Sequence, residues 1–222
     1  MASDRERSDD NEATRERLVG VTITLLKQDG NHALRLADVA RESGVAVSTI
    51  YAHFRDRTDL VAAARLMQFK AHADEALARV ADANEPSRTS DGVVHAAMGP
   101  SLLDPDTEDG RERRWDRIEA IADSRHIPEL ASQIRDLQSM FNKQIIEMVR
   151  QAQDLGLVDE SLDAAAVAMV SQVLRLGLAH WDISEDTRPD KAAWAETMNR
   201  VYGALLPGGI PSASMPGNFT PP

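Results

Sequence analysis

The side chains best suited to chemistry lie close together in residues 36–54, which read LADVARESGVAVSTIYAHF. Ser48, Thr49, Tyr51 and His53 each carry a polar group that donates or accepts hydrogen bonds. They fall on one short segment with helical spacing, and a short helix that presents such groups can contact base edges and phosphates in a DNA major groove. The pattern therefore predicts recognition of nucleic acid rather than the making or breaking of covalent bonds.

Motifs of enzyme active sites are missing from the sequence. It has no phosphate-binding loop, no GxGxxG, HExxH or GxSxG motif, and no paired carboxylates in an evident apolar setting. The absence of cysteine excludes disulfides, thiolate metal sites and a thiol nucleophile. His72 and Glu75 are three residues apart, but no third metal ligand accompanies them. We expect no catalytic residue, metal or cofactor, and an all-helical enzyme or ligand-binding protein without DNA binding is the alternative.

Charge is distributed unevenly along the 222 residues, whose formal net charge is −11. Residues 13–70 contain nine Lys and Arg against six Asp and Glu, whereas the rest of the chain contains sixteen against thirty. A mildly basic segment joined to an acidic remainder indicates that one end of the chain meets an anionic partner. A difference in charge of this size also arises by chance, so the sequence motifs have to distinguish the two interpretations.

The stretch with the polar side chains also has the pattern of two helices joined by a sharp turn. Val39 and Ala40 would pack the first helix against the core. Gly44 permits the left-handed backbone that a tight turn needs, and Val45 would fill the corner from inside. Ile50 would hold the second helix to the core. These positions predict a helix-turn-helix, for which an ordinary helical hairpin is the alternative.

Helical periodicity continues through most of the chain, and no stretch shows the alternation of a strand. We predict an all-α protein of about nine helices, one of them at 91–103. Gly30 and Gly156 would end helices, and Asp56 with Asp59 would form a capping box. The predicted organisation is a disordered arm (1–12), a helix-turn-helix DNA-binding domain (13–60), a helical ligand-binding and dimerisation domain (61–206) and a flexible tail (207–222).

The helix-turn-helix resembles that of the TetR-type one-component regulators over about residues 13–62. The close of the family's domain resembles GVxxxTLYxHFxxKxxL, and residues 44–60, GVAVSTIYAHFRDRTDL, follow it nearly throughout. The resemblance implies a DNA-binding regulator, in our interpretation a repressor, that binds a palindromic operator as a homodimer and is released by a small molecule. It also implies a set of DNA-binding residues: Arg35, Val47, Ser48, Thr49, Tyr51, His53 and Arg57.

Several of these positions have roles that the family pattern suggests. Thr49 matches a threonine that contacts a base or a phosphate, and Tyr51 matches a tyrosine that contacts a phosphate. Arg57 replaces the family's lysine, which keeps the charge and adds a fork of donors. Arg35 stands where a threonine usually caps the second helix, so a cap is lost and a cation is gained. Val47 replaces a frequently basic residue and could meet a thymine methyl.

The later helices carry apolar and aromatic residues with a few polar ones, a composition that ligand cavities share with ordinary cores. The residues that we assign to a small-molecule site are Trp115, Ile118, Met140, Phe141, Gln144, Met148, Val173, Gly177, His180 and Trp181. Small residues in 163–183, beside an amphipathic helix at 191–206, predict a four-helix homodimer interface, with one buried helix in a monomer as the alternative.

Nothing in the sequence predicts a membrane segment. No uninterrupted apolar run reaches the roughly 18 residues that a membrane span needs. The polar, charged N-terminus lacks the apolar core of a secretory signal. We therefore expect a cytoplasmic protein whose partners are double-stranded DNA, a small molecule and a second copy of itself.

Overall fold

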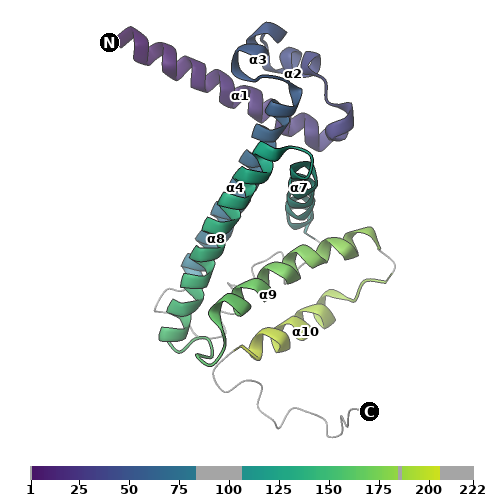
Figure 1. The fold of residues 1–222 in the computed structure, drawn as a ribbon. Helices are drawn as coiled ribbons and strands as arrows, with labels where there is room; N and C mark the ends of the chain where they lie inside the picture. The colour runs from purple at the N-terminus through teal and green to yellow at the C-terminus, as the bar shows by residue number, and fades with distance from the viewer. Residues whose placement is uncertain (1, 84–106, 185–186, 206–222) are drawn as a thin grey trace, which may run out of the picture. The chain divides into compact units, whose positions relative to one another are not determined.

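The computed structural model describes residues 2–83, 107–184 and 187–205. Within these ranges all regular structure is helical (Figure 1), which confirms the predicted all-α class. The helix predicted at 91–103 and the tail predicted at 207–222 lie outside the described residues. The elements are α1 (Ala2–Ala33), α2 (Leu36–Ser43), α3 (Val47–His53), α4 (Arg57–Ala83), α7 (Glu108–Ser124), α8 (Pro128–Asp154), α9 (Ala164–Gly177), the 3-10 helix η1 (Leu178–Ile183) and α10 (Lys191–Gly203).

Packing divides the chain into two compact units. Unit 1 comprises Met1–His72 and Asp116–Leu137, and unit 2 comprises Ala73–Trp115 and Gln138–Pro222. The helices α4, α7 and α8 each run from one unit into the other. The predicted boundary between a DNA-binding and a ligand-binding domain, at residues 60 and 61, stays a prediction. The boundary between the two packing units falls inside α4, α7 and α8, because each of these helices contributes turns to both units.

Unit 1 is built around apolar side chains that α1 to α4 bury together. Leu18 of α1, Val39 of α2, Ile50 of α3 and Leu60 of α4 are fully buried in one cluster, which Phe54 joins. Within this unit α2 packs against α1, and α3 packs against α2 (Figure 1). The predicted packing of the first and second helices of the motif is thus confirmed. One face of α3 is fixed to the core, and the opposite face is left outside.

A left-handed residue joins α2 to α3. Gly44 has φ 69° and ψ 29°, a conformation that glycine adopts without steric cost. The N–H of Val45 donates to the carbonyl of Ala40 at 3.0 Å, as in a Schellman helix end. Val45 is half-buried against the core cluster. The turn predicted from Gly44 and Val45 is confirmed, and it sets the direction in which α3 leaves α2.

The first helix is longer than the sequence predicts. It begins at Ala2, so most of the stretch predicted as a disordered arm is helical. Residues 9–12 are exposed, so these four residues add helix without adding core. Glu and Arg are good helix formers, and extending an existing helix costs less than nucleating one. At Gly30 the backbone leaves helical geometry, with φ 73° and ψ 171°, where the sequence predicts the end of the first helix.

The fourth helix begins with the predicted cap. The carboxylate of Asp56 accepts the N–H of Asp59 at 2.9 Å, and the carboxylate of Asp59 accepts the N–H of Arg55 at 3.0 Å. Backbone donors at the helix start, which have no partner within the helix, are satisfied in this way. Further along α4, Phe69 is buried in a cluster that includes Leu130 of α8. This cluster completes the packing of unit 1.

Unit 2 buries two smaller clusters. The second half of α4 packs with α8 and α9 through Ala76, Phe141 and Ala168. The end of α9 and η1 pack with α10 through Leu178 and Tyr202, and α9 and α10 lie side by side (Figure 1). The packing of α9 with both α8 and α10 fixes the frame in which η1 and the start of α10 are placed.

The ends of the helices in unit 2 are set by local signals. Gly156, with φ 70°, follows the end of α8, as the sequence predicts. Asp163 caps α9 by accepting the N–H of Ala166, and Asp190 caps α10 by accepting the N–H of Ala192, each at 2.8 Å. Carboxylates at these positions also interact favourably with the helix dipole.

Large apolar side chains on one face of α9 are exposed. Met169 and Val173 are 66% and 57% exposed, and Val170 and Leu176 are exposed as well. By length and composition the segment Ala164–Ile183 could also cross a membrane, a test that core helices of globular proteins pass too. A contiguous exposed apolar face is typical of a surface that another molecule covers.

Candidate nucleic-acid interface

Helix α3 has a buried face and an exposed face. Ile50 is fully buried in the core of unit 1, and Phe54, just after the helix, is 3% exposed. On the other side Val47 and Tyr51 are 37% and 55% exposed, with the exposed Ser48 beside them. Residues one turn apart share a helix face. This face therefore offers methyl groups, a hydroxyl and a phenol to a partner, groups that suit base edges and phosphates.

Thr49 and His53, the other predicted residues of α3, are half-buried at the edges of this face. Thr49 lies in the first turn, where its N–H donates to the carbonyl of Ala46 at 2.9 Å. The ring of His53 lies 6.4 Å from the ring of Phe54 and is tilted by 42°. The structure thus brings the five predicted residues of α3 onto one surface and its margins.

The guanidinium of Arg57 turns to the chain's own backbone. Its Nε donates to the carbonyl of Leu34 at 2.9 Å, and its Nη2 donates to the side-chain oxygen of Asn31 at 2.8 Å and also to the carbonyl of Asn31. The sequence predicts a phosphate-binding cation here. The structure gives Arg57 a structural role, because these three donor–acceptor contacts hold the connection between α1 and α2 together.

Asn31 is held from the other side by α7. Its Nδ2 donates to one carboxylate oxygen of Asp123 at 3.0 Å, and the second oxygen accepts Nε of Arg65 at 3.0 Å. Arg65 is 1% exposed and also pairs with Glu119 at 2.5 Å. A continuous series of polar contacts therefore runs from buried Arg65 to Arg57 and fixes the connection that leads into α2.

The other cations near α3 differ in how they are paired. Arg55 donates to Asp59 at 3.2 Å, and this bond holds the pKa of Asp59 below its usual value. Asp59 therefore contributes stability at neutral pH and loses that contribution as the pH falls through its lowered pKa. Arg41 pairs with Asp38 at 2.7 Å. Arg35 is exposed and makes no capping bond to α2 with its side chain, in agreement with the predicted loss of a cap, and its contact with a phosphate stays a prediction.

The residues assigned to a small-molecule site are spread over the core and the surface of the later helices. Phe141 is buried in the apolar cluster of unit 2, and Met148 packs against that cluster. Ile118 is half-buried. The other members of the predicted set are exposed: Trp115, Met140, Gln144, Val173, Gly177, His180 and Trp181. Only Trp181 of the ten lines the cavity of unit 2 that is described next.

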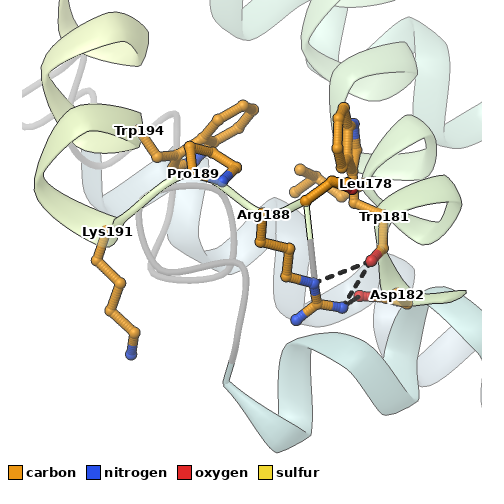
Figure 2. A pocket seen from close by; sticks show the side chains of 8 residues that line it. Leu178, Trp181, Asp182, Arg188, Pro189, Lys191 and Trp194 are labelled. Carbon is orange, nitrogen blue, oxygen red and sulfur yellow. Dashed lines mark hydrogen bonds and ion pairs between the residues drawn. The ribbon is translucent and has the colours of Figure 1, made fainter. Parts of the chain in front are cut away.

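A cavity of about 320 Å³ lies in unit 2 between η1, residues 187–190 and the start of α10 (Figure 2). The sequence analysis identified Trp181 but none of the other residues that line this cavity. Several of them are charged and follow an apolar helix, and a charged stretch in that position is typical of a solvent-exposed connection. The signal that could have found them is a pair of tryptophans on either side of a charged connection. The residues that line it are Leu178, Trp181, Asp182, Thr187, Arg188, Pro189, Lys191 and Trp194.

Within the described ranges no three His, Cys, Asp or Glu side chains are grouped closely enough to hold a metal ion. Each of the two spaced candidates lies beside another charged side chain. His72 lies 3.8 Å from Asp116, and Glu75 pairs with Arg113 at 2.8 Å. These contacts account for both side chains as parts of the helix packing in their own units.

Comparison with known proteins finds a family match for the N-terminal part of the chain and a shared fold for the rest. Residues 18–64 match the bacterial regulatory proteins of the tetR family. Among solved structures the chain is similar to a TetR-family transcriptional regulator from Mesorhizobium loti, with a TM-score of 0.70 and 16% identity over 88% of this chain and 97% of that one. A comparison with curated proteins found no significant match.

Two further structures with this fold were solved with ligands. A transcriptional regulator from Saccharomonospora viridis in complex with choline has a TM-score of 0.64 and 20% identity over 85% of this chain and 94% of that one. FadR from Bacillus subtilis in complex with stearoyl-CoA has a TM-score of 0.54 and 15% identity over 84% of this chain and 96% of that one. At these identities the likeness shows the fold alone.

We predict that Arg57→Ala lowers the stability of the fold, whereas Arg35→Ala lowers the salt dependence of DNA binding. Arg57→Ala removes the bonds to the α1–α2 connection, so the free energy of unfolding should fall by about 1–3 kcal/mol. Arg35→Ala should leave that free energy unchanged but reduce the slope of log K against log salt by about one unit per subunit. Urea unfolding and fluorescence anisotropy with a duplex at several salt concentrations measure the two effects.

Arg200→Ala is the matched control for both variants. Arg200 is exposed on α10 and pairs with Glu196 one turn away, so its loss should change neither quantity appreciably. Unchanged stability of Arg57→Ala together with a reduced salt slope would show that Arg57 holds a phosphate instead.

Proposed function

We propose that the chain, whose residues 18–64 match the bacterial regulatory proteins of the tetR family, is a transcriptional repressor that binds a palindromic operator as a homodimer. A small molecule would bind to unit 2 and release the repressor from the operator. The protein would act in the cytoplasm, where it meets the DNA.

The observation that carries this proposal is the exposed face of α3. Ile50 fixes the helix to the core, while Val47, Ser48 and Tyr51 face outward. A short helix that is anchored on one side and presents apolar and hydroxyl groups on the other suits the major groove. In a dimer two copies of α3 would enter successive major grooves with centres ~34–36 Å apart, so the operator would be a palindrome.

The exposed apolar face of α9 supports a homodimer. Met169, Val173 and Leu176 recur at intervals of four and three residues, so they form one stripe along the helix. Val201 of α10 is 44% exposed as well. In a two-fold symmetric dimer such a stripe meets its own copy. Two helices from each subunit would then form a four-helix interface, as predicted from the small residues of 163–183.

We expect a ligand to alter DNA binding through an element that contributes both to unit 2 and to the placement of α3. Helix α7 carries Arg114, which pairs with Asp182 of η1 at 2.6 Å, and later Asp123, which accepts the amide of Asn31. One helix therefore contributes to a charged cluster of unit 2 and to the connection before α2. A ligand that shifts α7 would change how α3 is held, with a coupling free energy of about 1–3 kcal/mol. The relatives bound to choline and stearoyl-CoA support only the general point that this fold accommodates small molecules.

Thr49→Ala should lower the preference for the operator over a scrambled duplex by about 1–2 kcal/mol, because the first half of a recognition helix lies closest to base edges. The salt slope should stay unchanged, because a hydroxyl releases no counterion. Fluorescence anisotropy with the DNA that flanks the protein's own reading frame, and with a scrambled version, measures both quantities.

The matched control is Thr197→Ala on α10, where the hydroxyl donates to the carbonyl of Ala193. Equal discrimination by Thr49→Ala and the unaltered protein would remove Thr49 from the recognition surface. Failure of the unaltered protein to prefer any segment of its flanking DNA would count against an operator at that locus.

Gly177→Glu should convert the dimer into a monomer. A Cβ at Gly177 meets no atom within 4 Å in the subunit, so the change is tolerated there. At a subunit interface the carboxylate would lose water without gaining a partner. Gly20→Glu on α1, whose Cβ likewise meets nothing within 4 Å, should remain a dimer. Sedimentation velocity at micromolar concentration distinguishes the two, and a monomeric wild type would contradict the proposed interface.

A further inference from the structure

The cavity between η1 and α10 has an indole ring in each of two walls. Trp181 stands with Leu178 on one side, and Trp194 stands with Pro189 on the other (Figure 2). The volume of about 320 Å³ lies within the range of small-molecule sites, roughly 300–1,000 Å³. A ligand of that size would meet apolar surface from both walls at once.

The fold holds the two indoles in place by different contacts. Trp194 is half-buried and packs against the buried cluster that joins α9 and α10. The main-chain carbonyl of Trp181 accepts Nε and Nη2 of Arg188 at 2.9 and 2.8 Å, as the dashed lines in Figure 2 show. These bonds tie the connection before α10 to η1. Both walls are therefore positioned before a ligand arrives, which lowers the cost of binding.

Polar groups of the lining bond to other parts of the chain. The side chain of Asp182 is 2% exposed and accepts two bonds from Arg114, at 2.9 and 2.6 Å. The hydroxyls of Thr187 and Ser184 share a hydrogen bond of 2.9 Å. Groups that already have partners gain little from a ligand, so we expect the apolar walls to provide most of its affinity.

Trp181 is 43% exposed, which leaves much of a large apolar side chain in water. Because this residue lines the cavity, a ligand there would cover part of that surface, and the burial of apolar surface is favourable. A flat aromatic ring lies closer to an indole face than a saturated ring does. Aromatic pairs also gain from offset stacking beyond the area that they bury. The walls therefore favour a planar aromatic ligand.

We propose that this cavity binds a planar aromatic compound, with its ring between Trp181 and Trp194. A quaternary ammonium is the other class of ligand that indoles attract, through cation–π contacts. Leu178 and Pro189 stand beside the indoles and have no π face for a cation, whereas an extended ring buries apolar surface against them. The role of such a ligand as an effector rests on the proposed function, whereas its binding does not depend on DNA.

Two probes with the same carbon skeleton test the preference for a flat ring. They are 2-naphthol, which is planar, and decahydro-2-naphthol, which is saturated and thicker. Both are uncharged at neutral pH, so the difference between their affinities reports the walls rather than the charges of the lining. Isothermal titration calorimetry on the full chain should show that 2-naphthol binds at least about fivefold more tightly. Equal affinities, no binding of 2-naphthol, or tighter binding of choline would overturn the proposal.

Variants of Trp181 then locate the site. Trp181→Leu keeps the main-chain carbonyl that Arg188 binds, and it should lower the affinity for 2-naphthol about fivefold, to near that of the saturated probe. Trp181→Phe retains an aromatic face and should retain most of the preference. A preference for 2-naphthol that survives Trp181→Leu in a folded variant would place the ring elsewhere and contradict the proposal.

Trp115→Leu is the matched control. Trp115 is 37% exposed on α7, so its exposure is close to that of Trp181, and it does not line the cavity. The control should bind both probes as the unaltered chain does, and loss of the preference in this variant would contradict the assignment. If Trp181→Leu fails to fold, the same comparison is made with Trp194→Leu in the other wall, which should lose the preference as well.

Two readouts separate this inference from the proposed function. Selective binding of 2-naphthol by a chain that binds no DNA would contradict the repressor and support the site. DNA binding by a chain that binds no 2-naphthol would support DNA recognition and contradict the site.

Discussion

The arrangement of the DNA-binding part depends on one shared carboxylate. Asp123 of α7 accepts Arg65 with one oxygen and Asn31 with the other. Because Arg65 is buried, its charge keeps the carboxylate in place, and the carboxylate positions the amide that Arg57 also binds. The connection from α1 to α2 therefore has a defined geometry. The left-handed turn at Gly44 then determines how α3 is presented.

Buried arginines join distant parts of the chain in both units. In unit 1 the buried Arg65 meets two carboxylates, Glu119 and Asp123, so its charge is compensated within the fold. In unit 2 Arg114 pairs with Asp182, and Arg111 and Arg188 lie near the same carboxylate. Helix α7 supplies members to both groups.

The parts of the fold that the sequence predicts are those that depend on neighbouring residues. The turn at Gly44 and the anchoring of Ile50 act over a few positions, so spacing alone identifies them. Arg57 could not be placed in this way, because its acceptors lie far away in the sequence and a long side chain can reach several partners. Apolar periodicity marks Phe141 as inward-facing but does not distinguish a core from a cavity. The convergence of three arginines on Asp182 has no local signature, because two of them lie on another helix.

Asp123 and Asn31 should place α3 as a pair, and a double-mutant cycle on DNA binding tests this most directly. The affinities of Asp123→Ala, Asn31→Ala and the double variant would be measured by fluorescence anisotropy, at a temperature where urea unfolding shows each variant to be folded. We predict that the double variant binds little more weakly than the weaker single variant, with a coupling energy of about 0.5–3 kcal/mol. Losses that simply add, with a coupling energy near zero, would contradict a joint role of these two residues in positioning the DNA-binding helix.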